Sequence, residues 1–417
     1  MNIKEKIEAQ AQKANLAAAK LAVLSSQEKN GALMSMATAL ETGQGEILAA
    51  NREDVSIAKE RGQRSSYIDR LTLNEKRIAQ MAEGLRATAA LPDPIGQTDY
   101  GVRRPNGMEI RRVRVPLGVI GIIYEARPNV TADAAALCLK AGNAVILRGG
   151  SEAIRSNTVI SRLLAEAAYK NGIPEGALQF VEVTEREAVD VMLKLKKLAV
   201  IIPRGGAGLI RHVTENSLVP VIETGTGVCH TYVDETADLD MAIKIAVNAK
   251  TSHPSVCNAM ETLLVHEKIA PKFLPLLEKA MGSKSVELRG CPHCRMICPN
   301  MKAADELDWS TEYGDLILAV RAVTGLDEAI SHINRYNTGH SETIVTQNLV
   351  SARRFQREVD AAAVYVNVST RFTDGFEFGF GAEIGISTQK LHARGPMGLM
   401  ELTSVKYLID GNGQIRE

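Results

Sequence analysis

The sequence predicts an α/β protein whose core is a doubly wound parallel sheet. Between residues 116 and 233, short apolar runs alternate with helical patterns, which is typical of parallel strands buried beneath helices. The alternation starts again near residue 239, which predicts a second α/β domain. The chain has 417 residues and is too long for one compact core, so two or three domains are expected.

The first 90 residues predict a helical section. Apolar residues recur at helical spacing in Ala11–Leu24, Gly31–Leu40 and Asn74–Ala90. Between the first two of these segments, Ser25–Glu28 has the pattern of a helix N-cap. The prolines of Leu91–Gln97 end the helical section.

A hairpin is predicted next, because Asn106-Gly107 separates two extended runs within Gly101–Val115. Five arginines lie in this segment: Arg103, Arg104, Arg111, Arg112 and Arg114. They are compatible with a phosphate or nucleic-acid patch. A solvated or inter-subunit ribbon is the favoured interpretation.

The first α/β region is predicted to contain five strands and four helices. The strands are Val119–Ile123, Ala144–Leu147, Leu178–Val183, Leu198–Ile202 and Val219–Ile222. The helices are Ala132–Lys140, Ile154–Asn171, Glu185–Leu195 and Gly208–Glu215. This order predicts a parallel sheet with helical crossovers.

The second region is predicted to repeat this architecture. Its helices are Leu239–Ala249 and Asp327–Tyr336. Its strands are Glu261–Val265, Leu316–Val323, Thr343–Val345 and Val364–Asn367. The tail segment Thr403–Ile409 is predicted to add a strand to the hairpin.

Composition excludes some classes of function. Lys+Arg and Asp+Glu both number 49, and this zero net charge argues against a general nucleic-acid binder. No run approaches the roughly 18 apolar residues of a membrane span. The charged N-terminus lacks the apolar stretch of a signal peptide, and the few, irregularly spaced cysteines favour a reducing cytoplasm.

Cys257 is the strongest candidate nucleophile. It lies in a polar turn between a predicted helix and the predicted strand Glu261–Val265. Such a turn keeps a thiol accessible and rigidly held, as covalent catalysis requires. A single cysteine in a turn is more often inert, so other motifs must support this assignment.

Two glycine-rich turns predict a nucleotide site. Arg148-Gly149-Gly150 and Arg204-Gly205-Gly206 each follow a predicted strand and precede a predicted helix. Glycine allows the backbone to approach a phosphate, and a helix N-terminus offers free N–H groups. Neither turn is a Walker loop, and either could be a simple connection, but two in one sheet favour a nucleotide.

Two polar residues at predicted strand ends have both a chemical and a structural interpretation. Asn129 follows the strand Val119–Ile123, where its amide could donate to an oxyanion or simply cap the next helix. Glu223 follows Val219–Ile222 and could be a general base or a solvated loop acid.

A cysteine cluster has the spacing of a metal half-site but is not expected to bind a metal ion. Cys291, His293, Cys294 and Cys298 lie within eight residues. A closed zinc site needs four ligands in workable geometry, and no second Cys-x2-Cys pair is present. Reduced surface cysteines without metal are the favoured interpretation.

Taken together, several long segments resemble the γ-glutamyl phosphate reductase family of the aldehyde dehydrogenase superfamily. The resemblance covers nearly the whole chain. It rests on Val115–Thr131, Lys140–Gly150, Ile202–Leu209, Val228–His230, Val247–Thr251, Ala363–Gly375 and Ser387–Leu399. The family implies an aldehyde-dehydrogenase-like fold with a cofactor domain, a catalytic domain and a β-hairpin for oligomerisation. These are expected at 1–98 and 117–226, at 227–396, and at 99–116 and 397–417, respectively.

The resemblance also implies roles for individual residues. Cys257 corresponds to the nucleophile and Asn129 to the oxyanion donor. The Arg148 and Arg204 turns correspond to cofactor-contacting segments. Glu312 resembles the glutamate that holds the nicotinamide ribose, although the match is displaced by one residue. The role of Glu223 stays open between activating water, orienting the cysteine and structuring its loop.

The family activity implied is NADPH-dependent reduction of L-glutamyl 5-phosphate to L-glutamate 5-semialdehyde, the second step of proline biosynthesis. Arginines suit the anionic groups of this substrate, and Arg127, Arg371 and Arg394 are the candidates, each of which could instead be a structural ion pair. His340 is a weaker candidate, more simply a loop histidine. The expected partners are copies of the chain in a homo-oligomer and the upstream glutamate 5-kinase. The alternative is a semialdehyde dehydrogenase that forms a free acid.

Overall fold

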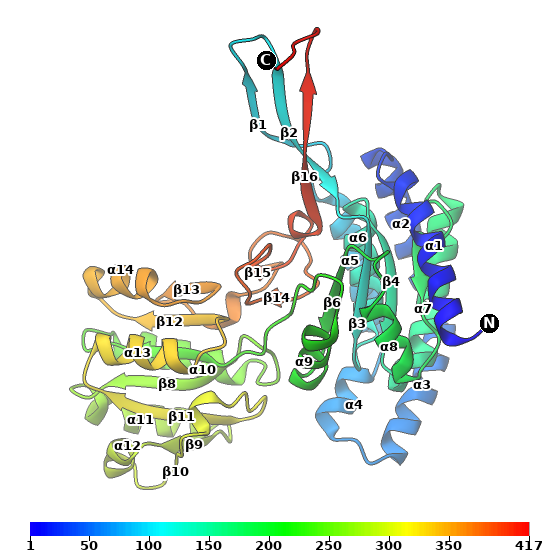
Figure 1. Ribbon diagram of the computed structural model, residues 1–417. Helices are drawn as coiled ribbons and strands as arrows, with labels where there is room; N and C mark the ends of the chain where they lie inside the picture. Colours follow the sequence, from blue (N-terminus) through cyan, green and yellow to red (C-terminus); the bar gives the residue numbers. More distant parts are fainter. Residues whose placement is uncertain (417) are drawn as a thin grey trace. The chain divides into compact units, whose positions relative to one another are not determined.

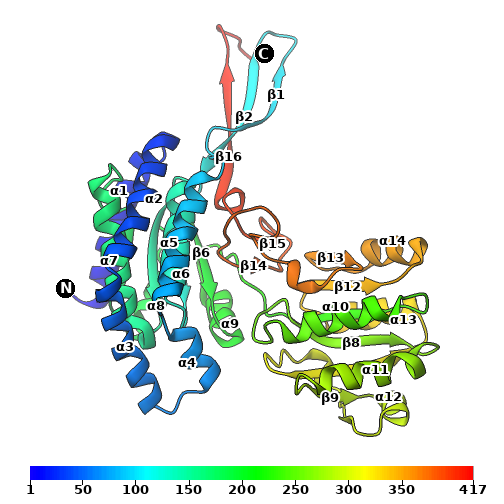
Figure 2. The same ribbon diagram turned by 180° about the vertical axis from the view of Figure 1, so that it is seen from behind.

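A computed structural model describes residues 1–416 of the protein, apart from the side chains of Ser65 and Ser66. The chain forms two compact units. Unit 1 comprises Met1–Thr224, Gly379–Gly385 and Met397–Glu417, and unit 2 comprises Gly225–Phe378 and Ile386–Pro396. Each unit has its own parallel sheet with helices on both faces (Figures 1 and 2).

Unit 1 begins with a group of helices. They are α1 (Ile3–Leu21), α2 (Ser26–Thr42), α3 (Gln44–Glu60), α4 (Ser65–Leu71) and α5 (Glu75–Ala90). The predicted N-cap is confirmed: the Ser25 hydroxyl accepts a hydrogen bond from the Glu28 N–H, and the Glu28 carboxylate accepts one from the Ser25 N–H. Asn2 and Glu5 form the same capping box at the start of α1.

The sheet of unit 1 has the strand order β5-β4-β3-β6, with every neighbouring pair parallel. The strands are β3 (Val119–Tyr124), β4 (Ala144–Gly149), β5 (Leu178–Phe180) and β6 (Val200–Arg204). The helices are α6 (Asn129–Lys140), α7 (Ile154–Lys170), α8 (Arg186–Leu193) and α9 (Ala207–Asn216), with a 3₁₀ turn, η1 (Ser151–Ala153), before α7.

One predicted strand of this sheet is wrong. Val219–Ile222 makes only an isolated parallel bridge, between Val221 and Ile201. Pro220 lies inside the segment and has no N–H to extend a ladder, which accounts for the short pairing. Pro203 is accepted within β6 because β6 is an edge strand.

A three-stranded antiparallel ribbon projects from unit 1 (Figure 1). It contains β1 (Thr98–Arg103), β2 (Glu109–Pro116) and β16 (Thr403–Asp410), in the order β1-β2-β16, with a 3₁₀ turn, η4 (Met400–Leu402), before β16. The predicted turn is confirmed, and Gly107 adopts the left-handed φ of 89° that favours glycine. Arg112 pairs with Asp99 and Arg111 with Asp410, which favours a solvated ribbon over an anion-binding patch.

Unit 2 is built on a seven-stranded parallel sheet with the order β10-β9-β11-β8-β7-β12-β13. The strands are β7 (Cys229–Val233), β8 (Met260–His266), β9 (Glu287–Gly290), β10 (Lys302–Ala303), β11 (Ile317–Val323), β12 (Ser341–Val345) and β13 (Ala363–Val366). A two-stranded antiparallel pair, β14 (Ile386–Ser387) and β15 (Gly395–Pro396), lies outside this sheet.

Two hydrophobic clusters attach helices to the sheet of unit 2. One contains buried residues of α10 (Leu239–Thr251), α11 (Ala270–Gly282) and α12 (Pro292–Ile297). The other contains buried residues of α13 (Leu326–Tyr336) and α14 (Leu349–Glu358). Short 3₁₀ turns are η2 (Asp308–Ser310) and η3 (Thr370–Phe372). Among the described residues of the whole chain, no helix is both long and apolar enough to span a membrane.

Candidate active site

The two glycine-rich turns of unit 1 lie at one edge of its sheet. β4 and β6 flank β3, and all three strands are parallel, so their carboxyl ends meet at the same edge. Arg148-Gly149-Gly150 leaves β4 and Arg204-Gly205-Gly206 leaves β6. The order β5-β4-β3-β6 places the topological switch point between β3 and β6, where open α/β sheets bind ligands.

Polar side-chain ends approach the glycines of both turns closely. A Cβ on Gly149 would lie 2.2 Å from the Asn157 side-chain nitrogen, and one on Gly205 would lie 2.5 Å from a Glu125 oxygen. On Gly150, a Cβ would lie 2.2 Å from a Glu152 oxygen. The backbone therefore comes close to polar side chains in both turns, a geometry suited to holding a polar ligand.

Sequence reasoning missed two carboxylates at this edge, Glu125 and Glu152. Glu125 accepts a hydrogen bond from the Gly206 N–H (2.9 Å) at the N-terminus of α9, and Glu152 accepts one from the Ala126 N–H (2.9 Å). The sequence carries a signal for both, because Glu125 lies within the segment Val115–Thr131 and Glu152 lies two residues after Gly150. These carboxylates accept hydrogen bonds from main-chain N–H groups of the kind that bind anions. They could also accept hydrogen bonds from ribose hydroxyls.

Arg148 and Arg204 contribute positive charge near these acids. Burial lowers the pKa of Arg148, although Glu152 and Glu125 oppose this shift. Arg148 also donates to the Thr184 carbonyl (2.9 Å). A cleft of about 140 Å³ adjoins Ser151 and Glu152, and two arginines line it, Arg61 and Arg155.

Asn129 and Arg127 follow β3 in the same unit. Asn129 is exposed and is the first residue of α6, whose N-cap is Pro128. Its amide donates to Asp133 (3.1 Å), so the capping interpretation is wrong. Arg127 is half-buried. Glu223, also in unit 1, accepts a hydrogen bond from the Thr214 hydroxyl (3.4 Å).

In unit 2, Cys257 lies in the turn between α10 and β8 and is half-buried. The next residue fixes this turn: the Asn258 amide donates to the Thr373 carbonyl (2.9 Å), and the Thr370 hydroxyl donates to the Asn258 carbonyl (2.7 Å). From behind, the Cys229 thiol donates to the Cys257 carbonyl (3.3 Å). The thiol thus belongs to a main chain that is held from two sides.

Gly227 packs directly against the main chain of Cys257. A Cβ on Gly227 would lie 1.4 Å from the Cys257 carbonyl oxygen, so this position cannot carry a larger residue without moving the turn. The Gly227 N–H donates to the Glu312 carboxylate (3.1 Å). The predicted ribose-binding residue Glu312 is therefore close to the candidate nucleophile and supports the segment behind it.

Arg371 is the predicted substrate arginine that the structure places beside Cys257. Its guanidinium donates to the Ser252 hydroxyl (3.0 Å) and bonds the Asn258 side chain. Burial lowers the pKa of Arg371, and the charge of Cys257 opposes that shift. Arg371 also lines a pocket of about 770 Å³, together with Lys244, Asn248 and other residues.

Two other predicted residues of unit 2 have structural partners. Arg394 pairs with Asp360 (2.7 Å). His340 lies in the loop before β12, as predicted, but is fully buried there, and its Nδ1 lies 2.7 Å from the Ser341 hydroxyl and 3.8 Å from the Cys229 sulfur. His340 therefore contacts the layer behind Cys257.

Comparison with known proteins identifies the family. The model of the aldehyde dehydrogenase family matches residues 2–296 and 309–408. A γ-glutamyl phosphate reductase from Moorella thermoacetica is 62% identical over 418 residues, which cover 100% of both chains. The chain belongs to the γ-glutamyl phosphate reductase family. It is thus an oxidoreductase of the aldehyde dehydrogenase superfamily, and membership implies a nicotinamide cofactor.

Solved structures agree with this family assignment. The crystal structure of γ-glutamyl phosphate reductase from Thermotoga maritima is 51% identical, with a TM-score of 0.95, and covers 98% of this chain and 99% of that one. An engineered glycolyl-CoA reductase with bound NADP⁺ is 16% identical, with a TM-score of 0.70, and covers 96% and 95% of the two chains. The latter shows the fold alone, and the predicted aldehyde-dehydrogenase-like fold is confirmed.

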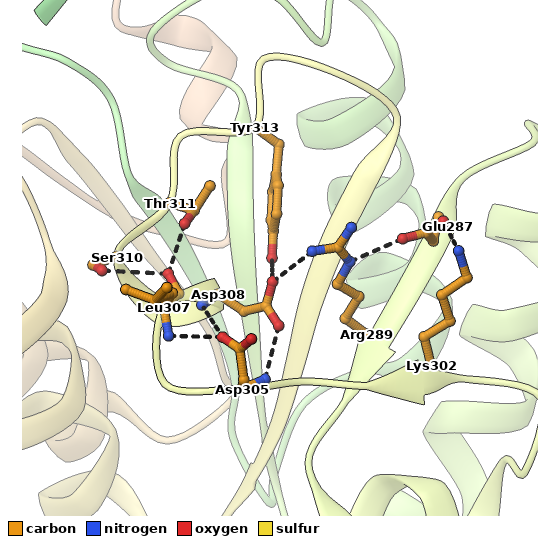
Figure 3. A network of polar contacts seen from close by, with 9 residues as sticks. All are labelled: Glu287, Arg289, Lys302, Asp305, Leu307, Asp308, Ser310, Thr311 and Tyr313. Carbon is orange, nitrogen blue, oxygen red and sulfur yellow. Dashed lines mark hydrogen bonds and ion pairs between the residues drawn. The ribbon is translucent and has the colours of Figure 1, made fainter.

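In this family member, a polar network anchors the segment that carries Glu312 (Figure 3). The Tyr313 hydroxyl and the Arg289 guanidinium both donate to Asp308, at 2.6 and 2.8 Å. The N–H of Gly314 donates to Glu261 (3.1 Å), which forms a fully buried ion pair with Lys250 (2.5 Å). Glu312 lies between these two anchors, so its carboxylate is held toward Gly227.

Proposed function

We propose that the chain reduces L-glutamyl 5-phosphate to L-glutamate 5-semialdehyde and phosphate with NADPH, the second step of proline biosynthesis. One observation carries this proposal: a half-buried thiol, Cys257, lies beside Arg371 in a chain that matches γ-glutamyl phosphate reductases over its whole length. An acyl phosphate is already activated, and a thiolate is the nucleophile suited to displace its phosphate.

In the proposed mechanism, the Cys257 thiolate attacks the acyl carbon, phosphate leaves, and a thioester forms on the sulfur. When bound, a reduced nicotinamide supplies the hydride that converts the thioester carbon to the aldehyde level. The rigid turn around Asn258 holds the sulfur in place. Collapse of the thiohemiacetal on Cys257 then releases the semialdehyde and restores the thiolate.

The oxyanion formed during attack needs hydrogen-bond donors. We assign this role to the exposed Asn129 amide and to a main-chain N–H near Cys257. The hydrogen bond from Asn129 to Asp133 orients the amide along the first turn of α6.

Arginines are proposed to bind the anionic groups of the substrate. Arg371 is the leading candidate, because it adjoins both Cys257 and the pocket of about 770 Å³. Lys244 adds a second cation to the pocket lining. Arg127 is also a candidate, because it follows β3. Arg394 is the weakest candidate, because it already forms an ion pair with Asp360.

The cofactor is proposed to bind at the switch point of unit 1. Arg148, Gly149, Gly150, Arg204, Gly205 and Gly206 form the candidate site. Each glycine-rich turn ends a parallel strand and precedes a helix, a position that suits a phosphate-bearing group. Arg155 of the neighbouring cleft pairs with Glu53 and Asp54, so the choice of NADPH over NADH rests on the biosynthetic direction of the reaction. Glu312 is proposed to contact the nicotinamide ribose.

The organisation of the chain follows from this function. Residues 1–98 and 117–226 are assigned to cofactor binding, and 227–396 to catalysis. The hairpin 99–116 and the tail 397–417 are assigned to oligomerisation into a homo-oligomer. A cytoplasmic location is also proposed, because the cysteines are few and irregularly spaced. An encounter with the upstream glutamate 5-kinase is proposed because an acyl phosphate hydrolyses readily in water.

The decisive experiment is the reverse reaction, in which glutamate 5-semialdehyde reduces NADP⁺ in the presence and absence of phosphate. Wild type is compared with Cys257→Ala and with Cys138→Ala, which alters a buried cysteine of unit 1. Turnover is expected to depend strictly on phosphate in the wild type and in Cys138→Ala. Turnover should be lost in Cys257→Ala. Turnover without phosphate would identify an acid-forming semialdehyde dehydrogenase and make Glu223 a base, and activity in Cys257→Ala would refute the mechanism.

A further inference from the structure

A second thiol site lies in unit 2 and is not used by the proposed reaction. Cys291 is the N-cap residue of α12, and Cys294 is the third residue of that helix. Their sulfur atoms are 3.5 Å apart, within hydrogen-bond distance of each other. Cys291 is partly exposed, whereas Cys294 is fully buried. One sulfur can therefore meet a reagent from solvent, and the other lies within reach behind it.

The surroundings of the pair stabilise a thiolate on Cys291. The Cys291 sulfur accepts a hydrogen bond from the Ala322 N–H (3.4 Å) of β11, and the N–H groups of His293 and Cys294 also face it. The Cys294 thiol and these N–H groups lower the pKa of Cys291. For Cys294, the contact with Cys291 and burial both raise the pKa. This asymmetry makes Cys291 the attacking sulfur and Cys294 the resolving one.

The geometry points to a reversible disulfide between Cys291 and Cys294, formed by exchange with small-molecule disulfides such as oxidised glutathione. The Cys291 thiolate attacks one sulfur of the reagent, which breaks the reagent S–S bond, releases one thiolate and leaves a mixed disulfide on Cys291. The Cys294 thiol then gives up its proton and attacks the Cys291 sulfur, which expels the second thiolate. The protein loses two hydrogen atoms, and the reagent is reduced to two thiols.

Metal binding is the competing interpretation of this cluster. Among the described residues, no group of three or more His, Cys, Asp and Glu side chains is arranged to hold a metal ion. Cys298, at the end of the same helix, is buried, and burial raises the pKa of its thiol to about 11. The structure thus isolates a pair of sulfurs rather than a set of four ligands.

The site is remote from Cys257 along the sheet. Cys257 precedes β8, whereas Cys291 directly follows β9, and both strands pair in parallel with β11. The two thiols therefore lie at opposite edges of one sheet. Disulfide formation at Cys291 can accordingly be tested independently of the proposed reaction.

The test uses full-length protein equilibrated with mixtures of reduced and oxidised glutathione, then quenched, alkylated and digested for mass spectrometry. Of the six cysteines, all of which the structure describes, Cys257 and Cys291 are the two that are not buried. A Cys257→Ser background therefore removes the other accessible thiol. A Cys291–Cys294 disulfide that dithiothreitol reverses is expected, and a Cys298→Ser control should behave in the same way.

Single variants separate the roles of the two sulfurs. Cys294→Ser should retain one glutathione on Cys291, and Cys291→Ser should leave Cys294 reduced in the folded protein. Alkylation of Cys291 at pH 7 should be at least about tenfold faster than that of Cys294. The proposal is overturned if both thiols stay reduced in oxidised glutathione, or if Cys294→Ser accumulates no mixed disulfide while remaining folded by circular dichroism.

Discussion

The Cys229 thiol donates a hydrogen bond to the main-chain carbonyl of Cys257, with 3.3 Å between sulfur and oxygen. Burial raises the pKa of Cys229 well above that of an ordinary thiol, so Cys229 stays protonated and remains a donor. The candidate nucleophile is thus supported from behind by a second, inert cysteine. This arrangement leads to the first prediction.

Replacing Cys229 with Ala should lower kcat about five- to tenfold, because loss of a buried hydrogen bond of about 1 kcal/mol would loosen the Cys257 main chain. The KM for cofactor should stay unchanged. Steady-state kinetics test this, with Cys138→Ala as a control in which a buried cysteine of unit 1 is removed. An unchanged kcat in Cys229→Ala would show that the hydrogen bond does not position the nucleophile.

Gly227→Ala should reduce kcat by about a hundredfold or more, because displacing the reacting atoms by about 1 Å is that costly. The added methyl carbon would overlap the Cys257 carbonyl group, at 1.4 Å from its oxygen. Gly282→Ala at the end of α11 is the matched control, since nothing lies within 4 Å of its Cβ position. Comparable activity in the two variants would contradict the tight packing behind Cys257.

Arg371→Lys should raise the KM for the acyl substrate about tenfold or more while changing the KM for the cofactor little. A lysine keeps the charge but cannot bond Ser252 and Asn258 while presenting a planar fork to an anion. The control is Arg353→Lys, an exposed arginine of α14. If both substitutions leave the KM for substrate unchanged, Arg371 is a structural residue.

The buried ion pair Lys250–Glu261 should reveal itself in stability rather than in binding. Lys250→Met leaves the Glu261 carboxylate buried without its cation and should lower the free energy of unfolding by about 3–5 kcal/mol. The double variant Lys250→Met/Glu261→Gln should recover about 2 kcal/mol of this loss, because it removes the uncompensated charge. Urea denaturation measures both values, and equal stability of the single and double variants would exclude a charge effect.

His332 should make the protein less stable in acid. Burial lowers the pKa of His332 from its ordinary 6.5 to about 3, so the folded state keeps this ring neutral while the unfolded chain protonates it. Its contribution to stability is complete above pH 6.5 and is lost as the pH falls toward 3. Between pH 6.5 and 5 the loss should be roughly 2 kcal/mol.

His332→Phe keeps an aromatic ring against Trp309 and Tyr336 but cannot bind a proton. Thermal unfolding followed from pH 7 to pH 5 should therefore show a shallower decline for this variant than for wild type. Tyr336→Phe removes a hydroxyl next to the same ring and should leave the decline unchanged. Parallel curves for wild type and His332→Phe would refute the prediction.

Much of the fold could be predicted from the sequence, because apolar strands and amphipathic helices have distinct periods. Strand β8 and helix α10 lie close to their predicted positions, and the Ser25 cap has the predicted geometry. The central strand β7 was missed as a strand, since its residues Cys229–Val233 are largely polar although all are buried. Periodicity does not reveal a strand that is buried on both faces and rich in polar residues.

The candidate site shows a similar division. A turn motif identified Cys257, and glycine spacing identified the turns at Arg148 and Arg204. The supporting groups Cys229, Glu125 and Glu152 were not predicted, because they act through contacts between segments distant in the sequence. Likewise, the ion pair of Arg394 with Asp360 depends on a tertiary contact that spacing cannot reveal.

In open parallel sheets, ligands usually lie at the carboxyl edge. Cys257 instead precedes β8, at the amino edge, and Cys291 follows β9 at the carboxyl edge. About six residues of strand separate the two levels, roughly 20 Å at 3.3 Å per residue. The sheet therefore acts as a rigid spacer between two thiols, and two different probes could be attached to one molecule without interfering with each other. A bifunctional thiol reagent much shorter than that spacer could not link Cys257 to Cys291 within one chain.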